Sequence, residues 1–151
     1  MIRFEDKEDF LEIDLANQED GEISSRGDAY LTLRVSSVGF VGHNDLWVSA
    51  GSLRSFCTAL IALERLRRGE ALIEAFSADE LKLKVHSVGS RGHMAVEGFS
   101  GYRVQRENSS QWHAVHFGFE FDPSQLKIAV MTEWIRKNAN GEGLQGRLPE
   151  D

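Results

Sequence analysis

The chain has little of several features that would place it in a familiar class. Among its 151 residues there are two prolines and a single cysteine, Cys57, so no intrachain disulfide can form. No apolar stretch approaches the ~18 residues of a membrane-spanning helix. The opening residues MIRFEDKEDF are charged and lack the apolar core of a signal peptide. These absences predict a cytoplasmic protein with no membrane partner.

Basic residues are scarce near the N-terminus. Residues 1–28 contain three basic and ten acidic residues, so this segment carries the whole net charge of −7, and the rest of the chain is neutral. Such a surface repels phosphate backbones and anionic lipids, which argues against nucleic-acid and membrane partners. It would attract a basic protein surface, although a role in solubility alone is an open alternative.

What is present is typical of a globular protein. Hydrophobic residues make up 41% of the chain and charged residues 27%, and the length favours one domain. We expect a single domain over residues 1–138. Residues 139–151 are rich in glycine and poor in apolar residues, which predicts a flexible tail.

Alternating apolar and polar residues predict β-strands, and apolar residues at helical spacing predict helices. The strands are expected over 10–16, 29–36 with a continuation bent at Gly39, 46–48, 70–76, 80–87, 93–104 and 111–121. The helices are expected over about 52–68 and 123–138. Short connections join the later strands, so the prediction is an α+β fold with a largely antiparallel sheet of about six to eight strands. The two helices are expected to pack on one face or to flank one end.

Local signals mark the helix ends. Ser49 or Ser52 would cap the first helix, and Gly69 can terminate it. Asp122 would cap the second, with Gln125 completing a capping box.

No motif in the chain predicts catalysis, a metal or a cofactor. The match to G-x-G-x-x-G at 141–146 follows a predicted helix, whereas dinucleotide binding needs a strand before it. His113 and His116 lie three apart in a strand pattern, so they point to opposite faces. Cys57 lies on the apolar stripe of a helix, which predicts a buried and unreactive thiol.

Three alternatives stay open. His86 and His93 could face each other across the hairpin at 88–92 as a metal site. With His43 and Asp45, they could instead line a pocket between sheet and helices in a small-molecule-binding domain or an enzyme. A homodimer that pairs through an exposed sheet edge is the other alternative.

Two tryptophans are candidates for binding a protein, because tryptophan is enriched at interface hot spots. Trp47 follows the acidic Asp45, and Trp112 alternates onto the face opposite Phe117. Packing in the core is the alternative role for each. The predicted partner-binding set is Glu19, Asp20, Glu22, Asp28, Asp45 and Trp47.

Several segments also occur in an order that resembles a known family. They are FLEIDL at 10–15, DAYLTLRVSSVGFVGHNDLWV at 28–48 and SLRSFCTALIALERLRRGEALI at 52–73, followed by LKLKV, GHMAVEG and HFGFEFDPSQL. In this order they resemble the WapI-type immunity proteins of bacteria.

The resemblance implies an antiparallel sheet with two helices and a role in neutralising a bacterial toxin domain. Many such toxins attack nucleic acid and are basic, so an acidic partner would be steered towards them. We therefore predict an immunity or inhibitor protein that binds its toxin stoichiometrically. The sequence does not specify the oligomeric state.

Overall fold

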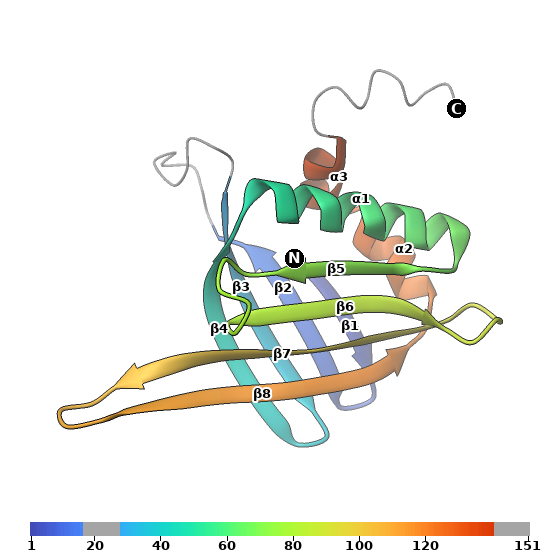
Figure 1. Ribbon diagram of the computed structural model, residues 1–151. Helices are drawn as coiled ribbons and strands as arrows, with labels where there is room; N and C mark the ends of the chain where they lie inside the picture. Colours follow the sequence, from blue (N-terminus) through green and yellow to red (C-terminus); the bar gives the residue numbers. More distant parts are fainter. Residues whose placement is uncertain (17–27, 141–151) are drawn as a thin grey trace.

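The computed structural model describes residues 1–16 and 28–140. Within these residues the chain forms two antiparallel sheets of four strands each and three helices (Figure 1). Sheet A has the order β1 (Ile2–Asp6), β2 (Asp9–Leu15), β3 (Ala29–Ser37), β4 (Phe40–Val48). Sheet B has the order β5 (Glu70–Glu74), β6 (Leu81–Val88), β7 (His93–Gln105), β8 (Ser110–Phe121). The helices are α1 (Ala50–Leu66), α2 (Ser124–Val130) and α3 (Glu133–Asn140). The predicted α+β class and antiparallel pairing are confirmed.

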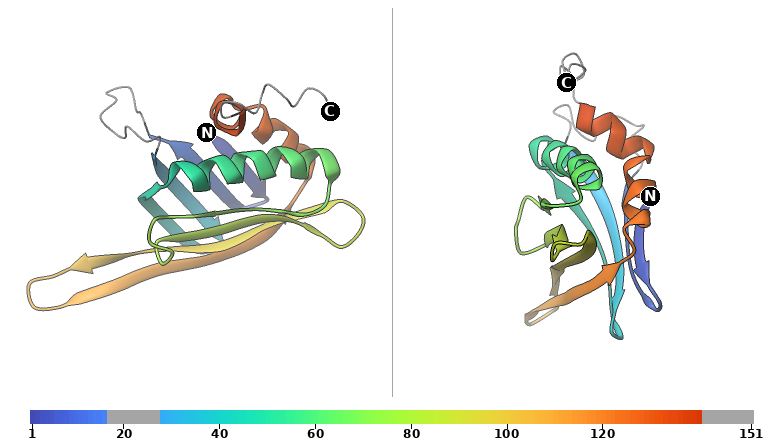
Figure 2. Two further views of the ribbon diagram at one scale, coloured as in Figure 1. Left: turned by 45° about the horizontal axis from the view of Figure 1, so that its top comes forward. Right: turned by 90° about the vertical axis from the view of Figure 1, so that its right-hand side faces the viewer.

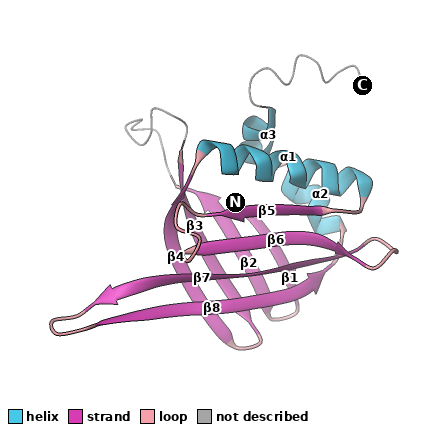
Figure 3. Ribbon diagram, viewed as in Figure 1, coloured by secondary structure: helices cyan, strands magenta, loops and turns pink. Residues whose placement is uncertain are grey.

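The two sheets pack against each other with their strands crossing steeply, and the helices close the open side (Figures 2 and 3). One continuous hydrophobic core takes residues from both sheets and all three helices. Phe4 of β1 and Phe121 of β8 lie within it, with ring centroids 4.4 Å apart. None of the helices in the described part of the chain is long and apolar enough to cross a membrane.

The β3–β4 connection differs from the predicted bent strand. Ser37 pairs with Phe40 across a turn in which Val38 and Gly39 have positive φ angles of 51° and 88°. Two left-handed residues are characteristic of the tight hairpin turns whose twist matches that of antiparallel strands. The bend predicted at Gly39 is therefore a reversal of the chain, and β4 runs unbroken through the residues between the two predicted pieces.

Helix α1 follows the expected stripe of apolar residues. The Ser49 hydroxyl accepts a hydrogen bond from the Ser52 amide at 3.1 Å, so Ser49 is the cap. The helix ends two residues earlier than predicted, because Arg67 already adopts the left-handed conformation with φ of 59°. Gly69 follows with φ of 112° and leads the chain into β5.

The second predicted helix is divided into α2 and α3 by a break at Met131 and Thr132. Both pieces lie against α1, and α2 also lies against β1, so α2 has a support that α3 does not share. Asp122 accepts a hydrogen bond from the Ser124 amide at 2.9 Å, which lowers the pKa of its carboxyl group. α3 continues past residue 138 to Asn140, and residues 141–151 lie outside the described part of the chain.

The predicted capping box is wrong, because Gln125 contacts a different element. Its side-chain amide donates to the carbonyl of Glu5 at 2.9 Å and accepts from the amide of Glu5 at 2.8 Å. Gln125 therefore forms, at the edge of β1, the two backbone hydrogen bonds to Glu5 that a neighbouring strand would otherwise form. Unpaired strand edges are exposed to association with other chains, and natural proteins commonly cover them.

Serine hydroxyls cover single residues of two other edge strands in the same way. Ser52 of α1 lies 3.3 Å from the carbonyl and 3.5 Å from the amide of Glu74 in β5. Ser37 of β3 lies 3.4 Å from the carbonyl and 3.2 Å from the amide of Gly118 in β8. Polar side chains from α1, α2 and sheet A thus form hydrogen bonds with the backbone of edge strands, in addition to the apolar packing of the core.

The β7–β8 hairpin projects beyond the rest of the molecule (Figures 1 and 3). The last residue of β7 that pairs with β6 is Ser100, and the hairpin continues to a turn in which the Arg106 amide donates to the Ser109 carbonyl at 2.7 Å. We call residues 101–114 the arm. Its exposed aromatic side chains include Tyr102 and Trp112.

Candidate functional site

The outward face of sheet A holds the predicted site residues that the structure describes. Strand alternation turns Tyr30, Thr32 and Arg34 of β3 outward, because Leu31 and Leu33 between them are buried in the core. The side chains on this face of β3 are exposed or half-buried.

An aromatic pair lies at one end of this face. Tyr30 and Trp47 are opposite each other in the β3–β4 pairing, and their ring centroids are 5.1 Å apart. Both are half-buried. The Trp47 carbonyl accepts a hydrogen bond from the Phe76 amide at 3.0 Å, so the strand beneath the indole is held in place.

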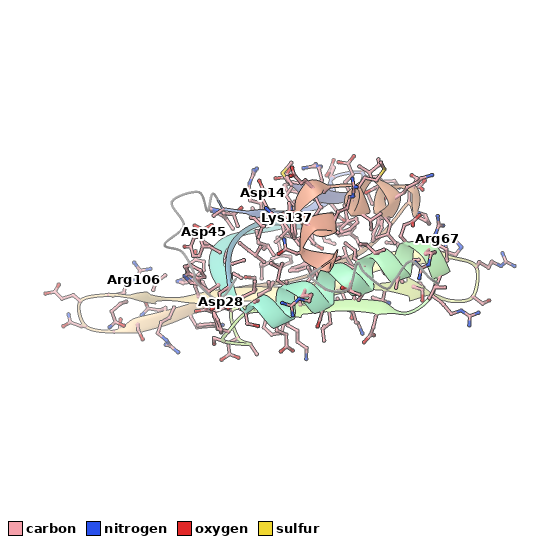
Figure 4. The ribbon with its side chains drawn as sticks, turned by 90° about the horizontal axis from the view of Figure 1, so that it is seen from above. Asp14, Asp28, Asp45, Arg67, Arg106 and Lys137 are labelled. Carbon is pink, nitrogen blue, oxygen red and sulfur yellow. The ribbon has the colours of Figure 1, made fainter. Side chains whose placement is uncertain are left out.

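Carboxylates surround this pair. Asp14 of β2 and Asp45 of β4 both pair with Thr32, one on each side, and share its outward face. Asp28 immediately precedes β3 and accepts a hydrogen bond from the Ala50 amide at 3.0 Å. Figure 4 places Asp45 and Asp28 towards the end of the molecule that bears the arm, with Asp14 nearer its middle. We call these three carboxylates with Tyr30 and Trp47 the acidic aromatic surface.

Two nitrogen groups lie close to these carboxylates. The N-terminal amino group lies 3.2 Å from Asp14, and His43 Nε2 lies 3.5 Å from Asp45. The carboxylates of Asp14 and Asp45 are both close to half exposed, so they stay accessible to a partner from solvent.

Sequence reasoning found only part of this surface. The structure brings Asp28, Asp45 and Trp47 together and adds Asp14 and Tyr30. The alternation that turns Asp14 and Tyr30 outward was available in the sequence, but the pairing of their strands was not. Three predicted residues lie outside the described part of the chain: Glu19, Asp20 and Glu22.

The other end of the same face has a different character. Glu12 accepts hydrogen bonds from Arg3 and from Arg34, and the Arg3 guanidinium lies 4.4 Å from the centroid of the Phe10 ring. The pKa of Arg3 is raised, chiefly by its hydrogen bond to Glu5. The face therefore changes from a mixed basic and acidic network to the acidic aromatic surface.

The alternative set of His43, Asp45, His86 and His93 does not form one site. The first two residues lie on the outward face of sheet A, whereas the two later histidines belong to sheet B. His86 pairs with Ala95 and His93 pairs with Val88, so the histidines are offset along the hairpin. The described residues contain no group of three or more histidine, cysteine, aspartate or glutamate side chains suited to a metal ion.

Three hollows are relevant to the pocket alternative. A cavity of about 340 Å³ between sheet A and the helices is lined by residues that include Leu53, Trp134 and Lys137, and by none of the four alternative residues. A second hollow is a groove of about 680 Å³ on the outward face of sheet B. It contains Lys82, Lys84, and the neighbouring rings of Phe99 and His116, among others. The third, of about 520 Å³, lies in the angle between β4 and the arm and is lined partly by His43, Tyr102 and His113.

The remaining sequence candidates are placed as follows. Cys57 is buried as predicted, and desolvation raises the pKa of its thiol to about 12. Trp112 lies on the face opposite Phe117, also as predicted, and its indole covers Gly101. A methyl group on Gly101 would lie 2.7 Å from the Trp112 ring, so the glycine makes room for the indole.

Comparison with known proteins adds limited information. No protein-family model matches the chain, and no solved structure matches it. The chain is similar to a glutamate–cysteine ligase of Haloquadratum walsbyi, with 23% identity over 149 residues. The match covers 95% of this chain and 35% of the ligase, so the chain spans about a third of that relative's length.

Proposed function

We propose that the chain is an inhibitor of the immunity type, which neutralises a toxin domain by stoichiometric binding through the acidic aromatic surface. The observation that carries this proposal is the Tyr30–Trp47 pair, half-buried on an outward sheet face and bordered by Asp14 and Asp45. Large rigid aromatic side chains supply contact area at low entropic cost, and they dominate the energetics of many protein interfaces.

The charge of this surface indicates the kind of partner. Asp14 and Asp45 flank Thr32 on the face that carries the aromatic pair, and the chain as a whole carries a net charge of −7. Complementary charge accelerates association and favours correct orientation, so a basic toxin domain is the fitting partner. The resemblance of the strand and helix segments to WapI-type immunity proteins supports the same proposal.

If a toxin domain is encoded beside this gene, a calorimetric titration against that domain is the direct test. We expect one-to-one binding with nanomolar affinity, together with loss of toxicity. Trp47→Ala should weaken binding by about 2 kcal/mol or more, as expected for a hot spot. Asp45→Lys should slow association at low salt and have a smaller effect at high salt, because salt screens exposed charges.

A matched control is Asp6→Lys. Asp6 is exposed at the opposite end of sheet A, where it pairs with Asp9 beside the β1–β2 turn. Asp6→Lys changes the net charge by the same amount as Asp45→Lys, but at a position away from the acidic aromatic surface. Equal effects of the two substitutions would show that only net charge matters, and unaltered binding by Trp47→Ala would exclude the surface.

A second candidate function follows from the similarity to the glutamate–cysteine ligase. In this alternative the chain binds a small amino acid or peptide in the groove of sheet B, where Lys82, Lys84 and His116 lie beside Glu70 and Glu97 and could contact both the carboxylate and the amino group of the ligand. Titration with glutamate and with cysteine, monitored by backbone NMR chemical shifts, distinguishes amino-acid binding from toxin binding. Shifts confined to β6–β8 that disappear in Lys84→Ala would favour this alternative.

A further inference from the structure

β8 is an edge strand whose backbone is largely open on one side. The amide and carbonyl of Gly118 point away from β7, since both contact the Ser37 hydroxyl. Backbone groups alternate in direction along an antiparallel strand, so those of Trp112, Ala114 and His116 point the same way. In the described parts of the chain, no hydrogen bond satisfies these outward groups.

The sequence of this edge is unusual for the molecule. Residues 108–119 contain no lysine, arginine, aspartate or glutamate, although charged residues make up 27% of the chain. Edge strands of soluble proteins are commonly protected by charged side chains, prolines, bulges or covering elements. The other edge strands carry charged residues, such as Arg3 in β1 and Glu70 in β5. An uncharged and open edge of this length is suited to accept another strand.

We propose that the occupant is a second copy of this chain, which aligns its β8 antiparallel to this one and forms a continuous sheet of four strands from each copy. The open stretch ends at Gly118, which Ser37 covers, and at the turn closed by Arg106 and Ser109. Its midpoint is His113. A two-fold axis there pairs Trp112 of each copy with Ala114 of the other.

Side-chain size fits this register. Trp112 and Ala114 lie on the same outward face, and Ala114 already pairs with Gly101 of its own β7. In the dimer the residue directly opposite each Trp112 would therefore be the small Ala114 of the other copy. The exposed fraction of Trp112, 42% in the single chain, would fall as a result. An isolated two-stranded ribbon is only marginally stable in water, so the arm also gains from added strands.

The turn at each end of the pairing brings Arg106, together with the neighbouring Glu107, towards carboxylates of the other copy. In this register Asn108, in the turn of one copy, lies level with Gly118 of the other. Glu97 is the β7 partner of Gly118, and Glu120 follows two residues later in β8. Arg106 is exposed on the arm (Figure 4) and would approach these carboxylates. The two-fold symmetry repeats the contact of Arg106 at both ends of the pairing. Between the ends, no like charges face each other, because residues 108–119 of each copy are uncharged.

The test is the molar mass in solution, measured by sedimentation equilibrium and light scattering across the micromolar range. We expect the full chain to reach twice the monomer mass. Ala114→Pro removes the outward amide without removing a hydrogen bond to β7, and proline is tolerated at such edge positions. It should raise the dissociation constant about a hundredfold or more, because each dimer loses two hydrogen bonds. Ala114→Gly retains the amide without adding side-chain bulk and is the matched control.

A charge swap provides an independent measurement. Arg106→Glu should weaken the dimer, and the double variant Arg106→Glu with Glu120→Arg should restore it, with circular dichroism verifying that each variant is folded. A wild-type chain that stays monomeric at all concentrations would overturn the proposal and leave the edge to a strand of another protein. A dimer that neither Ala114→Pro nor Arg106→Glu weakens would overturn it too, because the contact would then lie elsewhere.

Discussion

The side-chain amide of Asn44 in β4 donates a hydrogen bond to the hydroxyl of Ser100 in β7 at 2.9 Å, which joins the two sheets through buried polar groups. The same amide donates to the carbonyl of Gly101 at 3.0 Å, and Ser100 donates in turn to the carbonyl of Glu80 at 2.6 Å. Buried polar groups must be satisfied to avoid a desolvation cost, so this cluster fixes how one sheet meets the other.

We expect Asn44→Ala to lower the free energy of unfolding by about 1–3 kcal/mol, because it leaves buried acceptors without a donor. Ser100→Ala should have a similar effect, and the double variant should lose less than the sum of the two. Urea unfolding of the wild type, the two single variants and the double variant measures the interaction energy between Asn44 and Ser100. Thr32→Ala, on the outward face of sheet A, is a control. Strictly additive effects of Asn44→Ala and Ser100→Ala would contradict the hydrogen-bond network.

Gly98 is required by the close approach of β6 and β7. A methyl group there would lie 2.1 Å from the Lys82 carbonyl oxygen and 2.9 Å from Leu83 Cα, both of which are backbone atoms. Gly98→Ala should therefore destabilise the protein by about 1–3 kcal/mol or more through overpacking. The matched control is Gly51→Ala in α1, which meets no atom within 4 Å and should raise stability by at most ~1 kcal/mol. Thermal unfolding distinguishes the two, and equal effects would refute the close approach.

Gln125 is expected to protect the edge of β1. Gln125→Leu removes both hydrogen bonds to Glu5 and should lower stability by about 1–2 kcal/mol. Hydrogen exchange gives the specific readout, since the Glu5 amide should exchange faster in the variant. Lys127→Leu, exposed on the same helix, should leave that amide protected. An unchanged exchange rate in Gln125→Leu would mean that water replaces the side chain without loss.

The Cys57 thiol should make stability depend on pH in alkaline solution. Burial raises its pKa from the ordinary 9.0 to about 12, so between these values the folded chain keeps a proton that the unfolded chain has lost. The free energy of unfolding is therefore unaffected by this group below pH 9.0 and falls as pH rises towards 12. Urea titrations at several pH values measure the slope, which Cys57→Ala should reduce.

The same burial predicts that a thiol reagent at mild pH reacts only through unfolding. The rate should rise with urea in proportion to the unfolded fraction. Rapid reaction in the absence of denaturant would contradict the buried position of Cys57.

Strand periodicity was enough to predict the fold class, because each buried position in β3 or β6 alternates with an outward polar residue. Sequence reasoning missed β1, whose two apolar residues, Ile2 and Phe4, are too few to stand out among charges. It also joined α2 to α3, since the break at Met131 depends on what each helix packs against. Gln125 had the right spacing for a capping box, but the edge of β1, which is distant in sequence, binds its amide instead.

The candidate site was predicted less completely than the fold. Asp28, Asp45 and Trp47 were chosen for charge and residue type; Asp45 and Trp47 share the outward face of β4, and Asp28 immediately precedes β3, the strand paired with β4. Neither the grouping with Asp14 and Tyr30 nor the separation of His43 from His86 follows from local patterns. Both depend on which strands are neighbours and on which sheet each strand joins.

Every pair of neighbouring strands in the two described sheets is also consecutive along the chain, so each sheet is a simple meander. Loop closure for such pairings is local and entropically cheap, which favours early formation of each meander by itself. The contacts between sheets, including Asn44 with Ser100, span more than fifty residues and would come last. Substitutions at that junction should therefore accelerate unfolding far more than they slow folding, which makes it the place where the lifetime of the native state is set.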